Sequence, residues 1–376
     1  MPLLAFAFAI ALALAATGAC GPAGTPAAPA PPTAEGPARA DTPAPEMPGP
    51  ARARNQEAVI ANGACEACHL AEAAEWRASL HHTADVEPSY RRAFAIEPLP
   101  FCRGCHAPEA SPEEPETEAV AALGVGCVTC HVTNGAVLAA PWKGASAPPP
   151  APHAITRDAR FASDDACARC HEFGFPGTLG REPHEKMQWT VTEHARGPSA
   201  GTACAGCHMP IGAGGRRGHT FAASRDPAVL ARAVGITIER LAAGRVRVVL
   251  SPRDAGHAFP TGDLFRRVEV LAQAAGPDHL VLASDVRYLG RHFEPRGHSA
   301  GRRLLRDDRV YTEPVTVELD VSAGGAGRPI AVRVAYQRVD HPNGTDEQEA
   351  AVDGEIVLAE TVLPPIATPS PSPPRD

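Results

Sequence analysis

The apolar and polar residues of this chain change their pattern several times along its length. Residues 3–16 are an uninterrupted apolar run, and residues 21–56 are dominated by Pro, Ala and Gly. Residues 57–222 show neither the 3.6-residue period of an amphipathic helix nor the alternation of a half-buried strand. From about residue 230 onward the pattern becomes that of strands. The chain is therefore expected to contain two unlike domains behind an N-terminal leader and linker.

The C-terminal pattern predicts an all-β domain. Short segments rich in β-branched residues recur there, separated by Gly, Pro and Asp. These segments are Ile236–Ile238, Val246–Leu250, Val268–Leu271, Val315–Leu319, Ile330–Tyr336 and Ile356–Leu358. Six to eight strands over ~130 residues favour a β-sandwich. We assign it to residues 223–363 and expect residues 364–376, rich in Pro and Ser, to be a disordered tail.

The leader has the features of an export signal. Its apolar run of 14 residues is short for a membrane span but suits the hydrophobic region of a signal peptide. Small residues then precede Cys20, as in bacterial lipoprotein signals, although the leader lacks a Lys or Arg and has Thr17 where such signals usually have Leu. The alternative is an ordinary secretory signal with an incidental Cys. We predict a lipoprotein-type signal peptide at residues 1–19 and lipidation of Cys20, which places the protein in the periplasm or at the outer membrane or cell surface.

Residues 20–56 cannot bury a core, because Pro, Ala and Gly dominate them. We expect a disordered tether that holds the following domain away from the membrane. A second polar stretch, residues 107–118, carries five Glu among prolines, Glu109 included. We expect it to be a solvated loop without a function.

Composition sets further limits. The 376-residue chain has a formal net charge of −8, so it offers no basic surface for nucleic acid. Aromatic residues make up only 5% of the chain, which is little apolar bulk for two interiors. The chain has 11 Cys, and their spacing supplies the candidate chemistry.

The pattern C-x-x-C-H occurs five times in residues 57–222. Its Cys pairs are Cys65 and Cys68, Cys102 and Cys105, Cys127 and Cys130, Cys167 and Cys170, and Cys204 and Cys207. The His residues that follow them are His69, His106, His131, His171 and His208. This is the signature of c-type haem attachment: the two thiols form thioethers with one porphyrin, and the His becomes the proximal ligand of its iron.

Two other uses of these residues fit poorly. A zinc site takes two C-x-x-C pairs per metal ion and has no His fixed at the next position, and a disulfide framework gives no reason for the His. We therefore predict five covalently bound haems c in a domain at residues 57–222. It should be mainly helical and irregular, with no room for a sheet. Porphyrins would supply the missing apolar bulk, so the domain should not fold without haem.

Distal ligands must come from the remaining histidines. Of 16 His, five belong to the motifs, which leaves 11. Six of these lie in the haem domain, namely His81, His82, His153, His184, His194 and His219. The other five are His257, His279, His292, His298 and His341. Complete bis-His coordination needs only five, so about half of the 11 have another role.

Several segments of the chain resemble the multihaem cytochromes c of the c-552/c-554 type. The segments are Trp76–His81, Pro152–His153, Cys170–Phe173, Met187–Gln188, Cys207–Pro210, His219–Phe221 and Gly256–Gly262. The resemblance covers roughly residues 60–340 and implies a pentahaem protein with a C-terminal β domain. It also implies His81, His153, His219 and His257 as distal ligands. If His257 binds iron, the β domain is fixed to the haem domain.

The fifth distal position stays open. His82, His184 and His194 are the candidates, and Met187 is a further one, because a thioether can also ligate haem iron. Family members often have Trp where His194 stands, which argues against that residue. A haem without a distal ligand is also possible.

Two functions follow from these alternatives. If every iron has two ligands, the protein is an electron carrier, with other cytochromes or a quinol-oxidising membrane complex as partners. If one iron is five-coordinate, the protein can act on a small nitrogen or sulfur species, as related enzymes do on nitrite or hydroxylamine. We favour the carrier, because the chain has no C-x-x-C-K motif and no evident catalytic constellation. A docking role for the β domain is compatible with either function.

Overall fold

The computed structural model describes residues 44–112, 117–143, 148, 150–212, 215–223, 225–277, 280–295, 302–339 and 350–366. The predicted signal peptide, Cys20 and most of the predicted tail lie outside these residues. None of the helices in the described ranges is both long enough and apolar enough to cross a bilayer.

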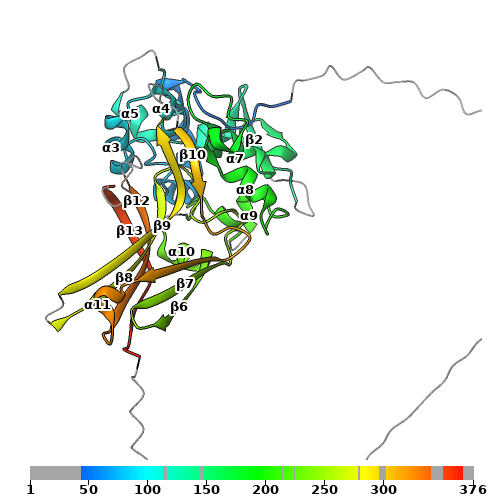
Figure 1. Ribbon diagram of the computed structural model, residues 1–376. Coiled ribbons are helices and arrows are strands. Elements are labelled where there is room, and N and C mark those ends of the chain that lie inside the picture. The colour runs from blue at the N-terminus through cyan, green and yellow to red at the C-terminus, as the bar shows by residue number, and fades with distance from the viewer. Residues whose placement is uncertain are drawn as a thin grey trace, which may run out of the picture. The chain divides into compact units, whose positions relative to one another are not determined.

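The N-terminal half of the described chain consists mainly of short helices joined by irregular segments (Figure 1). The helices are α1 (Asn55–Cys68), α2 (Leu70–Arg77), α3 (Pro88–Ile96), α4 (Pro100–His106), α5 (Glu118–Leu123), α6 (Cys127–His131), α7 (Asp165–His171), α8 (Thr190–Arg196), α9 (Cys204–His208) and α10 (Pro227–Ala233). Two 3₁₀ turns, Ala159–Ala162 and Pro183–Glu185, complete the helical part. The prediction of a helical and irregular N-terminal half is confirmed.

The same half also contains two small sheets, so the expectation that it has no room for a sheet was wrong. Strands β1 (Val132–Thr133), β2 (Ala136–Ala139) and β3 (Ile155–Arg157) form the first sheet, and β4 (Glu172–Gly174) and β5 (Lys186–Trp189) form the second. These strands are only two to four residues long, too short to show a period of two in the sequence. Backbone pairing immediately after the third and fourth motifs stabilises them.

The segment that precedes α1 packs on the helices, in contrast to the tether predicted for residues 20–56. Met47 is buried, Arg160 donates to the carbonyl oxygen of Pro45 at 2.8 Å, and Arg169 donates to that of Met47 at 3.1 Å. Two arginines far along the chain therefore satisfy backbone carbonyls of a segment whose composition predicts no burial. Such contacts cannot be read from local composition.

Glu109 also departs from its prediction as part of a solvated loop. Its side chain is fully buried, accepts two hydrogen bonds from the Arg54 guanidinium at 2.6 and 2.8 Å, and accepts one from the Thr129 hydroxyl at 2.7 Å. A buried carboxylate is stable when a cation and further donors satisfy it. Glu109 thus joins the start of α1 to α6.

The C-terminal half contains two antiparallel sheets, so the strand-rich prediction is confirmed. The larger sheet has the order β10 (Arg302–Asp307), β9 (Val281–Pro295), β8 (Arg266–Ala275), β12 (Ile330–Val339) and β13 (Val352–Leu363). The smaller has the order β11 (Val315–Asp320), β7 (Arg245–Pro252) and β6 (Val234–Ala242). One short helix, α11 (Ser322–Gly325), follows β11. All six strands predicted from the sequence are present.

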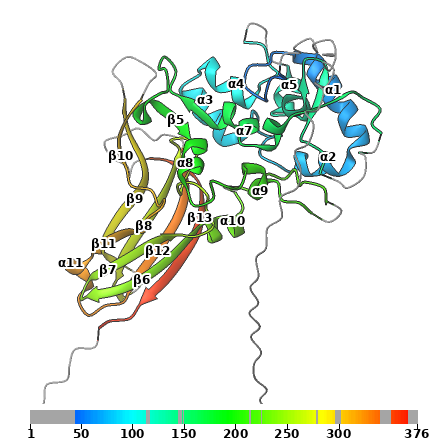
Figure 2. The ribbon, with the colours of Figure 1, turned by 90° about the vertical axis from the view of Figure 1, so that its right-hand side faces the viewer.

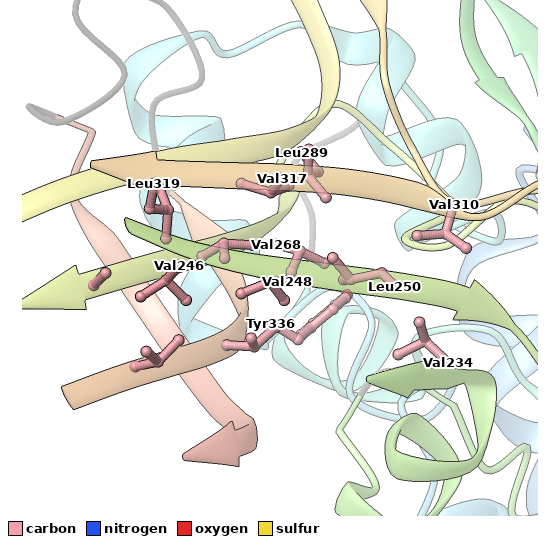
Figure 3. Close-up of a cluster of buried hydrophobic side chains, with 14 of the residues drawn as sticks. Val234, Val246, Val248, Leu250, Val268, Leu289, Val310, Val317, Leu319 and Tyr336 are labelled. Carbon is pink, nitrogen blue, oxygen red and sulfur yellow. The ribbon is translucent and has the colours of Figure 1, made fainter. Parts of the chain in front are cut away.

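One hydrophobic cluster lies between the two sheets (Figure 3). Alternate residues of β7 supply Val246, Val248 and Leu250, and β8 and β12 supply residues such as Val268 and Tyr336 from the other sheet. These side chains are at most 2% exposed. Burial of two facing apolar surfaces is what a sandwich requires, so this cluster is consistent with the finer prediction.

The hairpin formed by β9 and β10 reaches back to the helical half, where Figure 2 shows it beside β5 and α8. The Arg291 guanidinium donates to the carbonyl oxygen of Met187 at 2.9 Å and also to that of Lys186. Arg302 forms an ion pair with Glu97 at 3.1 Å. The β domain is therefore held against the helical half by polar contacts from one end of its larger sheet.

Candidate haem-binding sites

Each of the five C-x-x-C-H motifs lies at the C-terminal end of a short helix. These helices are α1, α4, α6, α7 and α9. Residues three apart in a helix lie on the same face, so both thiols of a motif project to one side. The His at the helix end can then turn beneath a group attached to them. The helical spacing thus arranges each motif as a single attachment site.

Four of the five motif imidazoles face a second imidazole from elsewhere in the chain. The ring centres are 6.4 Å apart for His69 and His153, 6.2 Å for His171 and His81, 6.3 Å for His131 and His219, and 6.3 Å for His208 and His257. The second histidines are the four that the family resemblance implies as distal ligands.

These separations allow a test of whether the residues fit haem. An imidazole nitrogen binds a first-row metal at about 2.0 Å, and the ring centre lies about 1.2 Å farther out, so two imidazoles on opposite sides of one iron have centres about 6.4 Å apart. Rings packed directly on each other are closer, as Tyr90 and His106 are at 3.9 Å. The four histidine pairs therefore fit one iron each.

Hydrogen bonds fix the orientation of several of these imidazoles. The Nδ1 atoms of His106, His131 and His208 donate to the carbonyl oxygens of Ala84 (2.7 Å), Leu138 (3.0 Å) and Ala222 (3.1 Å). His219 and His257 donate in the same way to Arg217 and Ala258, both at 3.1 Å. A carbonyl oxygen can only accept, so Nδ1 carries the proton and Nε2 is left to bind a metal.

Desolvation keeps the imidazoles of His81 and His171 in the neutral form that coordination needs. It lowers the pKa of His81 to about 3, with contributions from His171 and His208. It lowers the pKa of His171 to about 4, with contributions from His208 and His106. A neutral imidazole has the free lone pair that a metal ion requires.

The second motif differs from the other four. The Tyr90 ring of α3 stacks on His106, with an interplanar angle of 8°. Among the described residues, no histidine ring faces His106 as one faces each of the other motif histidines. His279, His298 and His341 lie outside the described residues.

The other candidates for the fifth distal position have different contacts. The His82 ring packs edge-on against Trp76 at 4.4 Å, and its Nδ1 is 3.2 Å from the carbonyl oxygen of Arg77. His184 lies in the turn Pro183–Glu185. Met187 packs against the hydrophobic cluster of Phe175, Leu264 and Phe293. None of them is brought to a second imidazole in the described structure.

His194 lies with Asp164 and Cys204 in a cluster whose ligand atoms are close enough together to hold a metal ion. Its Nδ1 is 3.0 Å from the carboxylate of Asp164, and both groups lie close to the thiol of Cys204. Cys204 is a motif cysteine, whose sulfur a thioether would occupy. The group is therefore a support for the fifth motif, in which Asp164 also accepts from the backbone N–H of Cys204 at 2.8 Å.

Contacts between thiols of different motifs show which motifs are neighbours. The Cys105 thiol of the second motif contacts Cys170 of the fourth, and Cys167 of the fourth contacts Cys204 of the fifth. Cys130 of the third motif interacts with both cysteines of the fourth. Cys127 and Cys65 pack on one hydrophobic cluster and so join the third motif to the first. The fourth motif therefore adjoins the second, third and fifth.

The interior of the helical half is small, which also fits bound porphyrin. Among the described residues, the two hydrophobic clusters that lie wholly within this half contain four residues (Ala58, Trp76, Leu123, Val128) and three (Ala107, Ala110, Val120). The cluster of the β domain has 19. A helical half of more than 150 residues cannot be stabilised by clusters of this size alone, so large apolar groups attached at the motifs would complete it.

Sequence reasoning missed several residues that support the histidines. Glu75 accepts hydrogen bonds from the Arg216 guanidinium and, at 2.7 Å, from the backbone N–H of His219. The bond from Arg216, followed by that from His219, lowers the pKa of Glu75 to about 2. The segment that bears His219 is therefore fixed to α2 by a charged carboxylate. The sequence gives no signal for this contact, which joins residues 144 positions apart.

A close backbone approach holds the His257 loop against α8. A Cβ atom on Gly197 would lie only 2.3 Å from the carbonyl oxygen of Gly256, and one on Gly256 would lie 2.9 Å from the Ser199 side chain. Only glycine avoids these overlaps. The two glycines thus let the loop bring His257 opposite His208.

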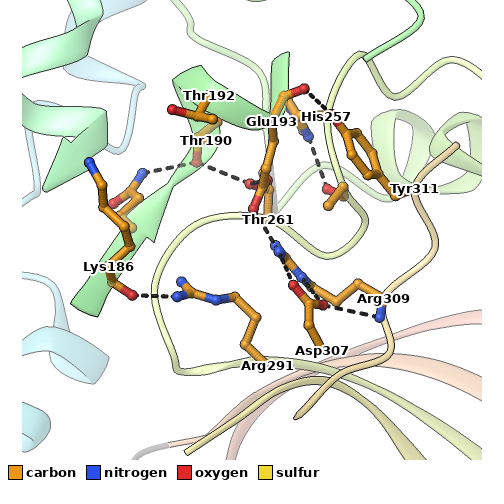
Figure 4. A network of polar contacts seen from close by, with 12 residues as sticks. Lys186, Thr190, Thr192, Glu193, His257, Thr261, Arg291, Asp307, Arg309 and Tyr311 are labelled. Carbon is orange, nitrogen blue, oxygen red and sulfur yellow. Dashed lines mark hydrogen bonds and ion pairs between the residues drawn. The ribbon is translucent and has the colours of Figure 1, made fainter. Parts of the chain in front are cut away.

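A buried polar network surrounds the same loop (Figure 4). Arg309, 4% exposed, pairs with Glu193, 5% exposed, at 2.7 Å and with Asp307 at 2.7 Å. Glu193 also accepts from the Thr261 hydroxyl at 2.6 Å, and its backbone carbonyl accepts from the Tyr311 hydroxyl. The network joins α8 of the helical half to the loop and strand ends of the β domain.

Comparison with known proteins agrees with this geometry. Residues 64–132 match the family described as cytochrome c554 and c-prime. The chain shares its fold with a penta-heme cytochrome c552 from Thermochromatium tepidum, with 18% identity, a TM-score of 0.61, and coverage of 84% of this chain and 100% of that one. No curated protein matches the chain.

The fold and the motifs of this chain are similar to those of multihaem c-type cytochromes. Its resemblance to the c-552/c-554 type, which the sequence segments suggested, is confirmed by the family match and by the shared fold. The part of the chain that matches the family, residues 64–132, contains the first three C-x-x-C-H motifs.

Proposed function

We propose that this chain is an exported electron carrier that holds five haems c and passes electrons between redox partners. The four histidine pairs with ring centres 6.2–6.4 Å apart are the observation that carries this proposal. Two imidazoles on one iron leave no position for a substrate, which suits a carrier better than an enzyme.

The residues around the motifs support each part of this role. Bound haem supplies an iron that takes up and releases an electron. The protein would supply both axial nitrogens at four sites, and carbonyl acceptors orient the rings of two of these pairs, His131 with His219 and His208 with His257. The proximity of the motif cysteines supports a path for electrons from the first motif through the third and fourth to the fifth. The second motif would be a side branch from the fourth.

The haem count tests the proposal. A pyridine haemochrome assay of the purified holoprotein should give five haems per chain, and a reductive titration should consume five electrons, because the sequence has five motifs. A lower haem count in fully matured protein would refute the assignment of the motifs themselves.

We further propose that the protein is anchored by a lipid at Cys20 and exchanges electrons with other cytochromes or a quinol-oxidising membrane complex. The net charge of −8, made more negative by haem propionates, favours partners with basic surfaces. A Cys20→Ala variant should move from the membrane fraction to the soluble periplasmic fraction. Its retention in the membrane would contradict the anchor.

The second motif favours one alternative function. Among the described residues His106 faces no histidine, so the iron of the haem that would be attached at Cys102 and Cys105 is the candidate for five-coordination. An open iron could act on a small nitrogen or sulfur species such as nitrite or hydroxylamine. A high-spin ferric haem that binds cyanide would support this alternative, and five low-spin haems would exclude it.

A further inference from the structure

Two arginines of the β domain lie side by side at the end of its larger sheet. Arg266 of β8 and Arg338 of β12 are direct cross-strand partners. The next pair on the same face is Val268 and Tyr336, and both are buried in the cluster between the sheets. Side chains alternate between the faces of a strand. The two guanidinium groups therefore continue the inward-facing row, although like charges directly opposite each other destabilise a sheet.

Among the described residues, the charges around this pair do not balance it. Asp263 is 3.6 Å from Arg266, and Glu87 of the helical half forms an ion pair with a third arginine, Arg225. Glu87 also accepts from the backbone N–H of Tyr90 at 3.0 Å and from the Ser89 hydroxyl at 3.1 Å. Three guanidinium groups thus share two carboxylates, one of which is already occupied by other donors.

Arg338 is the least satisfied member of the group. Its Nε atom is buried and has no hydrogen-bond partner among the described residues. Burial, followed by Arg225 and Arg266, lowers its pKa. A Cβ atom on Gly354 would overlap the guanidinium, so the glycine provides the space that Arg338 occupies. Within the described part of the chain, the site accommodates an arginine whose charge lacks a full counter-ion.

The arginine pair adjoins the second motif. The charged side chains that act on the imidazole of His106 are Asp263, Arg266 and Glu87. Glu87 caps α3, whose Tyr90 stacks on His106. The Tyr90 hydroxyl is buried without a hydrogen-bond partner among the described residues. Polar groups thus surround the place where a haem attached at Cys102 and Cys105 would lie.

We propose that Arg266 and Arg338 bind a carboxylate, and that this carboxylate is a propionate of the haem attached at Cys102 and Cys105. The proposal rests on the proposed function, because it requires haem at the second motif. A partly buried pair of cations needs a counter-ion at all times. A propionate of a covalently attached haem is always present, whereas a free oxyanion would be bound only part of the time. Guanidinium groups also match the two oxygens of a carboxylate.

The contact would have two consequences. Positive charge near a haem iron favours the reduced form through its electric field. Net charge is one of the main determinants of haem potential. The two arginines should therefore raise the midpoint potential of the second haem. They would also attach the β domain to this haem independently of His257, so that the β domain tunes two sites.

The test compares Arg266→Gln, Arg338→Gln and the double variant with Arg287→Gln. Arg287 is an exposed residue of β9 that pairs with Asp285, so it controls for loss of charge from the β domain. Each holoprotein is assayed for haem content and titrated spectroelectrochemically. We expect five haems per chain in all of them. One midpoint potential should fall in the Gln variants, with a decrease of about tenfold in the equilibrium constant for reduction of that haem, because a positive charge near its iron is lost. Arg287→Gln should leave all potentials unchanged.

Further variants and a ligand assay complete the experiment. Arg266→Lys and Arg338→Lys retain the charge and should retain most of the potential. The wild-type and double-variant spectra are also compared with and without nitrite or formate. Unchanged potentials together with loss of nitrite or formate binding in the double variant would assign the site to a free oxyanion and overturn the proposal. Unchanged potentials without anion binding would overturn it as well. A wild-type haem count below five would instead refute the proposed function.

Discussion

Replacement of His257 by Ala is expected to convert one low-spin haem into a high-spin haem. His257 is the imidazole that faces His208 at 6.3 Å, with the two rings 5° from parallel, and its carbonyl-bound Nδ1 leaves Nε2 to bind the iron. Loss of this ligand should leave the haem at the fifth motif with one axial nitrogen. The change should be visible in the optical spectrum and in EPR as one additional high-spin haem per chain.

His292→Ala is a suitable control for this experiment. His292 lies on β9 and its Nε2 is 2.9 Å from the Asp308 carboxylate, so its loss should not alter any haem. If the His257→Ala protein had the same number of low-spin haems as the wild type, His257 would not be an axial ligand.

Replacement of Arg309 by Met is expected to reduce the free energy of unfolding by about 3–5 kcal/mol, as for the loss of one partner from a buried ion pair. Arg309 is 4% exposed and balances both Glu193 and Asp307. Without it, two carboxylates would be left together at the contact between the two halves. Denaturant unfolding, followed by haem absorbance and by circular dichroism, measures the effect.

Arg287→Met is the matched control, because it removes an exposed ion pair from the same domain. Such a pair contributes about 1 kcal/mol or less. Equal losses in the two variants would show that the buried network of Figure 4 does not stabilise the contact between the halves.

The sequence predicted the regular parts of this fold and missed those that depend on distant contacts. The six predicted strands have continuous β-branched residues, and the structure contains all of them. Strands β9 and β10 were missed because polar residues such as Arg291, His292 and Arg303 interrupt their apolar pattern. Arg291 is nevertheless buried, because carbonyl oxygens about 100 residues earlier in the chain accept its hydrogen bonds. The local pattern of apolar and polar residues contains no information on such distant hydrogen-bond partners.

The predictions for the candidate sites likewise divide into those made from local spacing and those that needed contacts between distant residues. The spacing of the motifs predicts the haem-attaching cysteines and the proximal histidines, since each such site is local. The distal histidines came from the family resemblance, and their pairing could not be derived from position in the chain. His81 follows the first motif but faces His171 of the fourth, and His153 precedes the fourth motif but faces His69 of the first. Only the tertiary structure brings these rings together.

The most direct test of the account is a quantitative low-temperature EPR spectrum of the ferric holoprotein, normalised to the haem content. The four histidine pairs predict at least four low-spin haems with two imidazole ligands per chain. The spin state of the haem at the second motif then decides between the carrier, for which it is low-spin, and the alternative function, for which it is high-spin. Fewer than four low-spin haems per fully loaded chain would contradict the pairing on which the proposed electron carrier depends.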